Sequence, residues 1–284
     1  MKTKPIFLRL TKVLFPILIL VAIGTGAWYY KYIYSYKRWF TTHLTATVWT
    51  TAKEKEVKEI VQQPFHYFGK GSTSNAYVSL DGKFVLKTFL KTKFTSKSGQ
   101  SIPGLRELLN KRKELRIKYN RIFGPINAYQ YIPQESGMIY YQFIHPKSRF
   151  EQLIQLTEQD GSITWLDPNQ EEYIIQKKAV IAADYLQEHL KKGDIDRVKS
   201  GIFKLLQMTK TLYDQGIVLV TLQFLDNFGF IGDEPMRIDV EHVRFDPEWK
   251  EKGKAHFQKE TAKFRRWIIR YAPEMLPYFD EVSR

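Results

Sequence analysis

The chain has 284 residues, of which 43% are hydrophobic and 15% aromatic. This composition excludes an intrinsically disordered protein, and the length allows one large domain or two small ones. Lys and Arg number 44 against 30 Asp and Glu, which gives a net charge of +14. A basic surface favours polyanionic partners such as nucleotide phosphates, phospholipid headgroups or nucleic acid. The absence of Cys excludes disulfides, thiolate metal sites and cysteine nucleophiles.

An uncharged segment at residues 13–30 follows a short basic start. As a helix it would be about 27 Å long, enough to span a bilayer. Trp and Tyr crowd its outgoing end, as is typical of a membrane interface. The alternative is a cleaved signal peptide, because residues 24–27 are small and stand at a plausible cleavage point. We favour a retained anchor, residues 1–30, in a single-pass membrane protein; the flanking charges do not determine its orientation.

Residues 31–64 have the composition of a juxtamembrane stalk. A Thr-rich stretch is followed by a mixture of Lys and Glu from Lys53 to Gln63, which is typical of an exposed helix, and Pro64 ends it.

A glycine-containing hairpin opens the domain that follows. Gly69 and Gly71 lie in a turn between two predicted strands, and Asp81-Gly82 is a strong signal for a second tight turn. A third strand then delivers Lys87 from an apolar run. Glycines without Cβ atoms let backbone amides approach a phosphate closely, and Lys87 lies within reach of the same phosphates.

The next predicted elements are a helix from Pro103 to about Ile122 and two strands, at residues 126–132 and 138–144. The helix has an apolar stripe and is otherwise basic, and Glu107 and Glu114 project from one flank of it. With the three earlier strands, these two complete a five-stranded lobe over residues 65–145.

From residue 146 to the end the pattern predicts a mostly helical region. We expect helices at residues 151–156, 169–191 and 195–213, and a basic helix at about residues 256–271. Between the last two lies a loop, strand, turn and strand. Asp226 and Asn227 end the loop, and Asp239 follows the second strand.

The glycine hairpin, Lys87 and the paired acidic positions together resemble the protein-kinase-like superfamily, in the short divergent form found in bacteria. The resemblance covers about residues 65–246 and implies a bilobal α+β fold that binds ATP and Mg²⁺. It assigns phosphate contacts to Gly69, Gly71 and Lys87, with Ser74 in place of the third loop glycine. It also implies that a helix glutamate, Glu107 or alternatively Glu114, pairs with Lys87.

In that family an Asn and an Asp hold the metal ions, and an Asp in the catalytic loop acts as the base. Asp226 or Asn227, together with Asp239, would hold Mg²⁺ here, because carboxylate and amide oxygens suit this ion. The position of the base holds Thr221, which cannot act as a carboxylate. Asp226 is the only carboxylate of the loop, so it would serve the metal or take over the base role.

Three functions follow from these residues. The first is a membrane-anchored, nucleotide-binding pseudokinase with weak or no phosphotransfer. The second is an active atypical Mg²⁺-dependent phosphotransferase, using Asp226 or Asp239 as catalytic residues. The third is a non-enzymatic protein that contacts a membrane surface or nucleic acid. We favour the first, with the domain in the cytoplasm and a protein or anionic lipid as a further partner; nucleic acid is not expected.

Overall fold

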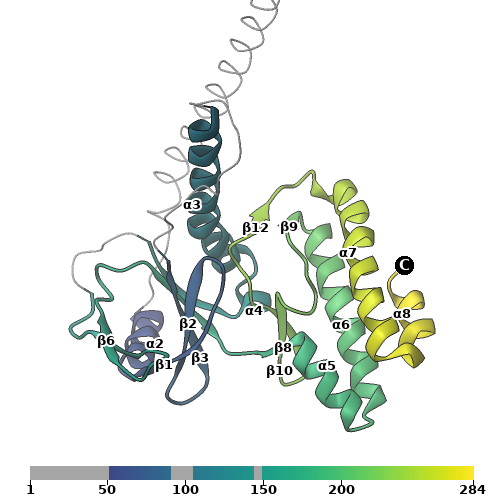
Figure 1. The fold of residues 1–284 in the computed structure, drawn as a ribbon, viewed down its shortest axis with the longest axis horizontal. Helices are drawn as coiled ribbons and strands as arrows, with labels where there is room; N and C mark the ends of the chain where they lie inside the picture. The colour runs from purple at the N-terminus through teal and green to yellow at the C-terminus, as the bar shows by residue number, and fades with distance from the viewer. Residues whose placement is uncertain (1–50, 91–104, 144–148) are drawn as a thin grey trace, which may run out of the picture. The chain divides into compact units, whose positions relative to one another are not determined.

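The computed structural model describes residues 51–90, 105–143 and 149–284. The chain divides into two units, Met1–Glu54 and Lys55–Arg284. The second unit has an α+β fold, as predicted, with a seven-stranded sheet, two smaller sheets and a group of helices (Figure 1). The predicted membrane span lies outside the described residues. No helix within the described ranges is long and apolar enough to cross a membrane.

The glycine hairpin forms as the sequence predicts. Strands β1 (Phe65–Lys70), β2 (Ser74–Ser79) and β3 (Phe84–Phe89) pair antiparallel in succession. In the turn between β2 and β3, the Asp81 carboxylate accepts hydrogen bonds from the Ser79 hydroxyl at 2.6 Å and from the Lys83 amide at 3.1 Å. Gly82 takes the left-handed conformation that such a turn requires, with φ of 72°.

The large sheet has seven strands instead of the five predicted. Its order is β4-β7-β3-β2-β1-β5-β6, and β1 pairs parallel with β5. Strand β4 (Met138–Gln142) was predicted, whereas β5 (Ile154–Thr157), β6 (Ile163–Leu166) and β7 (Tyr173–Lys177) were not. The helices predicted at residues 151–156 and 169–191 are therefore wrong where β5 and β7 lie. β7 is buried between β3 and β4, and periodicity does not distinguish such a short apolar run from a buried helix.

Helix α3 (Leu105–Tyr131) is longer than predicted and continues through Pro125. The strand predicted at residues 126–132 is wrong, because this segment is the last part of α3. Tertiary packing decides the outcome, since Ile122, Ile126 and Ala128 are all buried although they point to different sides of the helix. A short helix, α4 (Pro133–Ser136), then leads into β4.

Helix α2 (Thr51–Val61) precedes β1, as the Lys and Glu pattern predicts. It is not exposed on all sides, because Val57, Ile60 and Val61 are buried. These three positions recur with helical spacing, so one face of α2 belongs to the core of the second unit.

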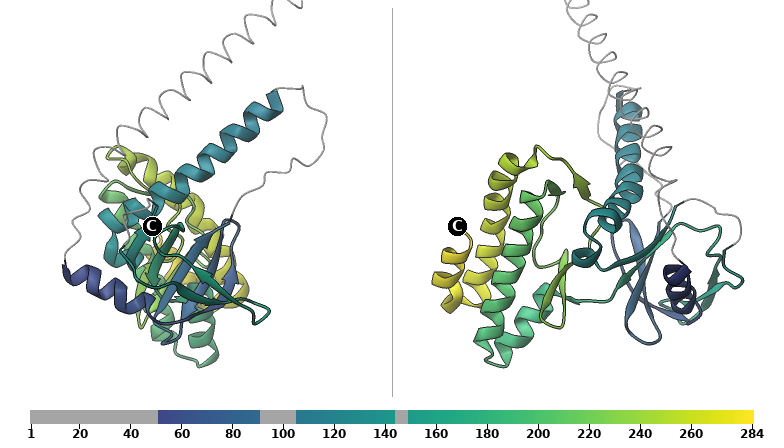
Figure 2. Two further views of the ribbon diagram at one scale, coloured as in Figure 1. Left: turned by 90° about the vertical axis from the view of Figure 1, so that its left-hand side faces the viewer. Right: turned by 180° about the vertical axis from the view of Figure 1, so that it is seen from behind.

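The C-terminal helices are α5 (Ala182–Lys191), α6 (Ile195–Asp214), α7 (Trp249–Tyr271) and α8 (Leu276–Val282), with a 3₁₀ turn, η1 (Pro273–Met275), before α8. The α6 prediction is confirmed, and the Asp194 carboxylate caps its N-terminus by accepting a hydrogen bond from the Arg197 amide. Helix α7 begins at Trp249, earlier than predicted. Helices α6, α7 and α8 pack against one another (Figure 1, and from behind in Figure 2).

Two small sheets complete the fold. They contain β8 (Val180–Ile181), β9 (Ile217–Leu219), β10 (Phe228–Ile231), β11 (Glu234–Arg237) and β12 (Val243–Phe245). The β10–β11 hairpin is the predicted strand, turn and strand. One hydrophobic cluster runs from Ile132 and Ile174 through the small sheets to Phe279, so the large sheet and the helices share a core.

Candidate functional site

A polar cavity of about 390 Å³ lies between the glycine turn of the large sheet and the segments that flank the β10–β11 hairpin. Its lining residues come from five parts of the chain: Gly71, Ser72, Thr73, Ser74, Ala76, Lys87, Ile174, Thr221, Gln223, Asp226, Asn227, Ile238, Asp239, Val240, Glu241 and His242. Lys87 and Asp239, which are more than 150 residues apart in the sequence, therefore line the same cavity.

Most of the predicted site residues line this cavity. Gly71, Ser74 and Lys87 come from the sheet side, whereas Asp226, Asn227 and Asp239 come from the opposite side. Gly69 does not line it and pairs with Ala76 in the β1–β2 ladder. Glu107 and Glu114 lie in the first turns of α3, and their side chains are outside the described part of the structure. Pairing of either one with Lys87 therefore stays a prediction.

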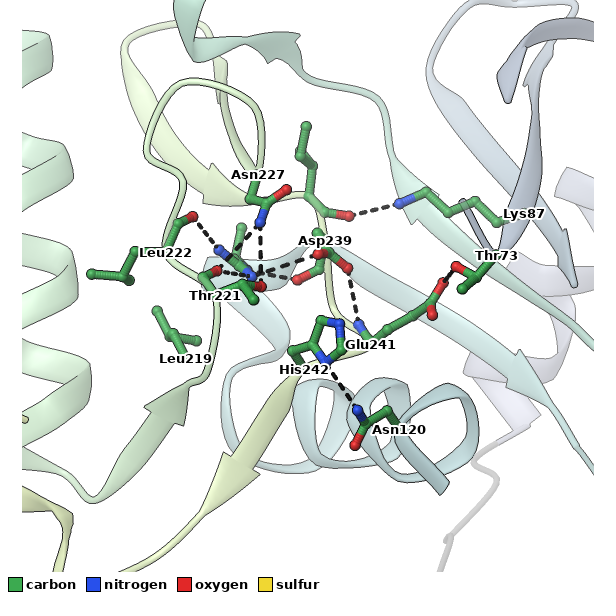
Figure 3. A network of polar contacts seen from close by, with 12 residues as sticks. Thr73, Lys87, Asn120, Leu219, Thr221, Leu222, Asn227, Asp239, Glu241 and His242 are labelled. Atoms are coloured by element: carbon green, nitrogen blue, oxygen red, sulfur yellow. Dashed lines mark hydrogen bonds and ion pairs between the residues drawn. The ribbon is translucent and has the colours of Figure 1, made fainter. Parts of the chain in front are cut away.

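Lys87 lies in the middle of β3, between Ala76 of β2 and Ile174 of β7. Its ammonium donates a hydrogen bond of 2.6 Å to the backbone carbonyl of Ile238, as Figure 3 shows. Desolvation lowers the pKa of Lys87, and the charges of Asp239 and Glu241 partly oppose that shift.

The glycine turn is held at Thr73. The Thr73 carbonyl accepts hydrogen bonds of 2.8 Å from the Arg121 guanidinium and 2.8 Å from the Leu90 amide. The Thr73 hydroxyl donates to the Glu241 carboxylate at 2.5 Å (Figure 3). Arg121 also donates to the Leu90 carbonyl. Sequence reasoning missed Thr73, Arg121 and Glu241 as a set, because they come from three distant segments with no shared motif.

Neither glycine of the turn is required by packing within the protein. A Cβ atom at Gly69 would meet no atom within 4 Å, and one at Gly71 would make ordinary contacts with Ser74 at 3.6 Å or more. Both have backbone conformations that other residues adopt, since neither φ is positive. The open space above the turn is what a phosphate approaching the backbone amides would need.

The opposite side of the cavity is built on Arg237, a side chain with 0% exposure. Its guanidinium donates to the carbonyls of Asp239 at 2.6 Å, Leu222 at 2.9 Å and Thr221 at 2.7 Å. It also stands over the Phe228 ring and 3.8 Å from the Asp239 carboxylate. Burial lowers its pKa to about 10, so Arg237 stays charged at neutral pH. Sequence reasoning missed this residue, because a single Arg in a strand gives no signal.

The loop between β9 and β10 is shaped by Gln223, whose φ of 41° is the only positive value among non-glycine residues of the described chain. Its carbonyl accepts hydrogen bonds from the Asp226 amide at 3.0 Å and the Asn227 amide at 2.9 Å. Residues with a strained backbone conformation of this kind are found most often at binding sites and active sites. The Asn227 side-chain amide donates to the Thr221 carbonyl at 3.3 Å, and the Asn227 carbonyl accepts from the Ile238 amide at 3.0 Å.

Glu241 has a raised pKa, because burial disfavours its ionised form and the charge of Asp239 acts in the same direction. The hydrogen bond from Thr73 and the charges of Lys87 and Arg121 oppose the shift. The neighbouring ring of His242 contacts the Asn120 side chain of α3 at 3.1 Å. Helix α3 approaches this segment closely at Gly124, where a Cβ atom would lie 2.3 Å from the Val240 carbonyl oxygen.

The residues predicted to hold Mg²⁺ have the type of donor atom that this ion prefers. Asp226, Asn227 and Asp239 offer oxygen donors to one cavity, and Mg²⁺ needs only one or two carboxylates when phosphates and water complete its shell. Asp226 is exposed, and Asp239 is about one-third exposed. Within the described ranges, no group of three or more His, Cys, Asp or Glu residues forms a metal site of protein ligands alone.

No protein-family model matches the sequence, and no curated protein matches it either. Among solved structures, the fold is distantly similar to the bifunctional kinase-methyltransferase WbdD, with 15% identity and a TM-score of 0.35 over 65% of this chain and 33% of that one. WbdD in complex with the kinase inhibitor LY294002 gives 13% identity and a TM-score of 0.35, over 67% and 36% of the two chains. Rv3197 of Mycobacterium tuberculosis, solved with erythromycin, gives 12% identity and a TM-score of 0.35 over 87% and 67%. The matched part spans about a third of the length of WbdD.

Proposed function

We propose that the cavity binds ATP with Mg²⁺ and that the protein is a kinase-like module of the pseudokinase type, with weak or no phosphotransfer. One observation carries the proposal: Lys87 and Asp239, predicted from sequence as the phosphate and metal contacts, line one polar cavity with the glycine turn. The cavity volume lies in the range of small-molecule sites.

The chain's own residues have separate roles in this proposal. The amides of the glycine turn and the Lys87 ammonium would bind phosphate oxygens, the ammonium by giving up its hydrogen bond to Ile238. Asp239, with Asp226 or Asn227, would hold Mg²⁺, which when bound neutralises phosphate charge. Arg237 would keep Asp239 and the Thr221 loop in place through its three carbonyl contacts.

The position of the catalytic base argues for weak transfer. Thr221 lines the cavity where the resemblance expects a carboxylate, and a general base contributes about 10²–10⁴-fold in rate. The second candidate, an active atypical phosphotransferase, is favoured by one observation. Asp226 is exposed in the same cavity, so a carboxylate stands in the loop that carries Thr221.

Thermal-shift titration with ATP, with and without Mg²⁺, tests the binding proposal. We expect the wild type to be stabilised, most strongly with Mg²⁺, and we expect Lys87→Ala and Asp239→Ala each to weaken binding about 10–100-fold, since each loses a charge-assisted contact. Lys83→Ala is the matched control, because Lys83 is an exposed lysine of the same hairpin. If the wild type binds no nucleotide in the presence of any divalent metal ion, both the pseudokinase and the phosphotransferase hypotheses are wrong.

Phosphotransfer separates the two candidates. If the protein is a pseudokinase, we expect no phosphoryl transfer above background from ATP to water, lipid or saccharide acceptors. Measurable transfer that disappears in Asp226→Ala, with nucleotide binding retained, would support the atypical enzyme instead.

We also propose that the domain lies in the cytosol, where ATP is available, and that residues 13–30 anchor it as a single membrane-spanning segment. The support for this proposal is the uncharged length of that segment. The full chain should resist carbonate extraction from membranes, and the domain should be degraded by protease only on the cytosolic side of sealed vesicles. A mature chain beginning near Ala27 would show a cleaved signal peptide.

A further inference from the structure

The exposed face of α7 carries a row of five basic side chains: Lys252, Lys259, Lys263, Arg266 and Arg270. All five are exposed. At 3.6 residues per turn they fall within about 60° of one another around the helix axis and extend over about 27 Å. We call this set the basic row.

The opposite side of α7 belongs to the core. Phe257, Phe264 and Ile268 are buried in the hydrophobic cluster, against α6 and α8. The helix is therefore fixed in rotation, and the basic row is held facing outward. In Figures 1 and 2, α7 runs as one continuous helix beside α6.

Carboxylates do not neutralise this face. From Lys252 to the end of α7 the only acid is Glu260, which is buried and pairs with Lys263 at 2.6 Å. Among the described residues, no other member of the basic row has a carboxylate partner. Arg270 instead stands over the ring of Tyr271 at 5.3 Å. The result is a straight band of solvated positive charge.

Small and apolar residues flank the basic row on one side. Ala255, Ala262 and Ile269 are exposed and repeat every seven residues, so they form a second line beside the first. Ile269 is 47% exposed. Basic and apolar lines side by side on one helix are typical of contact with an anionic membrane surface.

Single-stranded nucleic acid fits this face less well. Its binding sites combine basic grooves with a series of exposed aromatic rings on which bases stack. On α7, Phe257 and Phe264 are buried and Trp249 and Trp267 are partly buried, which leaves Tyr271 as the exposed ring.

We infer that the basic row of α7 is a docking surface for an anionic lipid bilayer, which the helix contacts peripherally while its other face stays in the core. The inference rests on α7 alone and does not depend on nucleotide binding in the cavity.

Sedimentation with lipid vesicles tests the inference on a chain that begins at Lys53. This chain lacks the candidate membrane span but keeps the compact unit Lys55–Arg284 and its described core, which starts at Val57. We expect binding to phosphatidylcholine vesicles that contain phosphatidylglycerol and no binding to phosphatidylcholine alone. Binding should weaken steeply with added salt, since the Debye length falls from about 10 Å at 0.1 M to about 3 Å at 1 M.

The deciding variant combines Lys259→Gln, Arg266→Gln and Arg270→Gln. Each cation near an anionic surface contributes about fivefold in affinity, so the triple variant should bind about 100-fold more weakly. The matched control combines Lys83→Gln, Lys177→Gln and Lys191→Gln, three exposed lysines outside α7 whose loss changes the net charge equally. Both variants should keep the wild-type melting temperature and nucleotide response.

Three results would overturn the inference: no wild-type binding to the anionic vesicles, wild-type affinity in the α7 variant, or an equal loss in the control. Single-stranded DNA serves as the competing probe. If the wild type binds DNA through the same three residues but ignores the anionic vesicles, α7 is a nucleic-acid surface and the lipid inference is wrong.

Discussion

The two sides of the cavity are held in place by different means. The side formed by residues 221–227 and 237–241 is fixed by a buried guanidinium that binds three backbone carbonyls. The glycine turn is fixed by polar contacts of one residue, Thr73, near the surface. Buried polar networks rigidify the parts that they connect, whereas half-exposed contacts break more easily. We therefore expect changes on the first side to affect folding and changes on the second to affect local motion and binding.

Arg237→Met should have the largest effect. It removes the guanidinium donor of three backbone carbonyls, of which, among the described residues, only the Thr221 carbonyl keeps another donor, the Asn227 side chain, and it leaves the Asp239 carboxylate without its partner. We expect a loss of about 3–5 kcal/mol in the free energy of unfolding, as for a broken buried ion pair. Urea unfolding followed by circular dichroism measures the loss. Arg197→Met, which removes a half-exposed arginine, is the control. A change below about 1 kcal/mol for Arg237→Met would contradict the view that this side of the cavity is built on Arg237.

Gly124→Ala tests the contact of α3 with the same side. The added methyl group would meet backbone atoms of Val240 and Glu241 at 2.3–2.4 Å, and backbone cannot move aside as a flexible side chain can. We expect a loss of about 1–3 kcal/mol in stability. Gly69→Ala, where the added atom meets nothing within 4 Å, should leave stability unchanged or slightly raised. If the two changes altered stability equally, α3 would not be in close contact with the backbone of Val240 and Glu241.

Thr73→Val tests the glycine turn. It removes the hydroxyl that donates to Glu241 and keeps the side-chain shape, so we expect a stability loss of about 1 kcal/mol. The sharper measurement is hydrogen exchange. Amides of residues 71–74 should exchange faster, whereas those of the β10–β11 hairpin should keep their protection. Faster exchange on both sides would mean that the two sides open as one unit.

The pH dependence of stability tests Glu241. Its raised pKa means that the folded state favours the protonated carboxyl, so its contribution to stability is fully present below the ordinary value of 4.5. That contribution is lost as the pH rises through the raised pKa. Glu241→Gln should therefore stabilise the protein at neutral pH and flatten this part of the profile. Urea midpoints across that range measure it, with the exposed Glu171→Gln as control. If the stability of Glu241→Gln changed with pH in parallel with that of the wild type, the Glu241 carboxylate would not be the buried charge that we describe.

Local signals in the sequence were sufficient where neighbouring residues decide the structure. The β1–β2–β3 hairpins follow from glycine turns and alternating strands, α6 from its apolar stripe, and β10–β11 from its turn. Lys87 lies in β3, and Asp226, Asn227 and Asp239 directly flank the β10–β11 hairpin. For that reason the cavity's main residues could be named from sequence.

Only the tertiary structure decided the rest. The segments at residues 126–132 and 173–177 are apolar runs of similar length, yet one ends α3 and the other is a central strand. What differs is the partner. Helix α3 packs against β12, where the Asn127 side chain donates a hydrogen bond to the Val243 carbonyl, whereas the second segment has β3 and β4 to receive its backbone hydrogen bonds. Arg237 and the contacts of Thr73 with Arg121 and Glu241 gave no signal, because each joins groups far apart in the sequence. Charge, turn residues and periodicity are local properties, whereas burial depends on what the rest of the chain brings alongside.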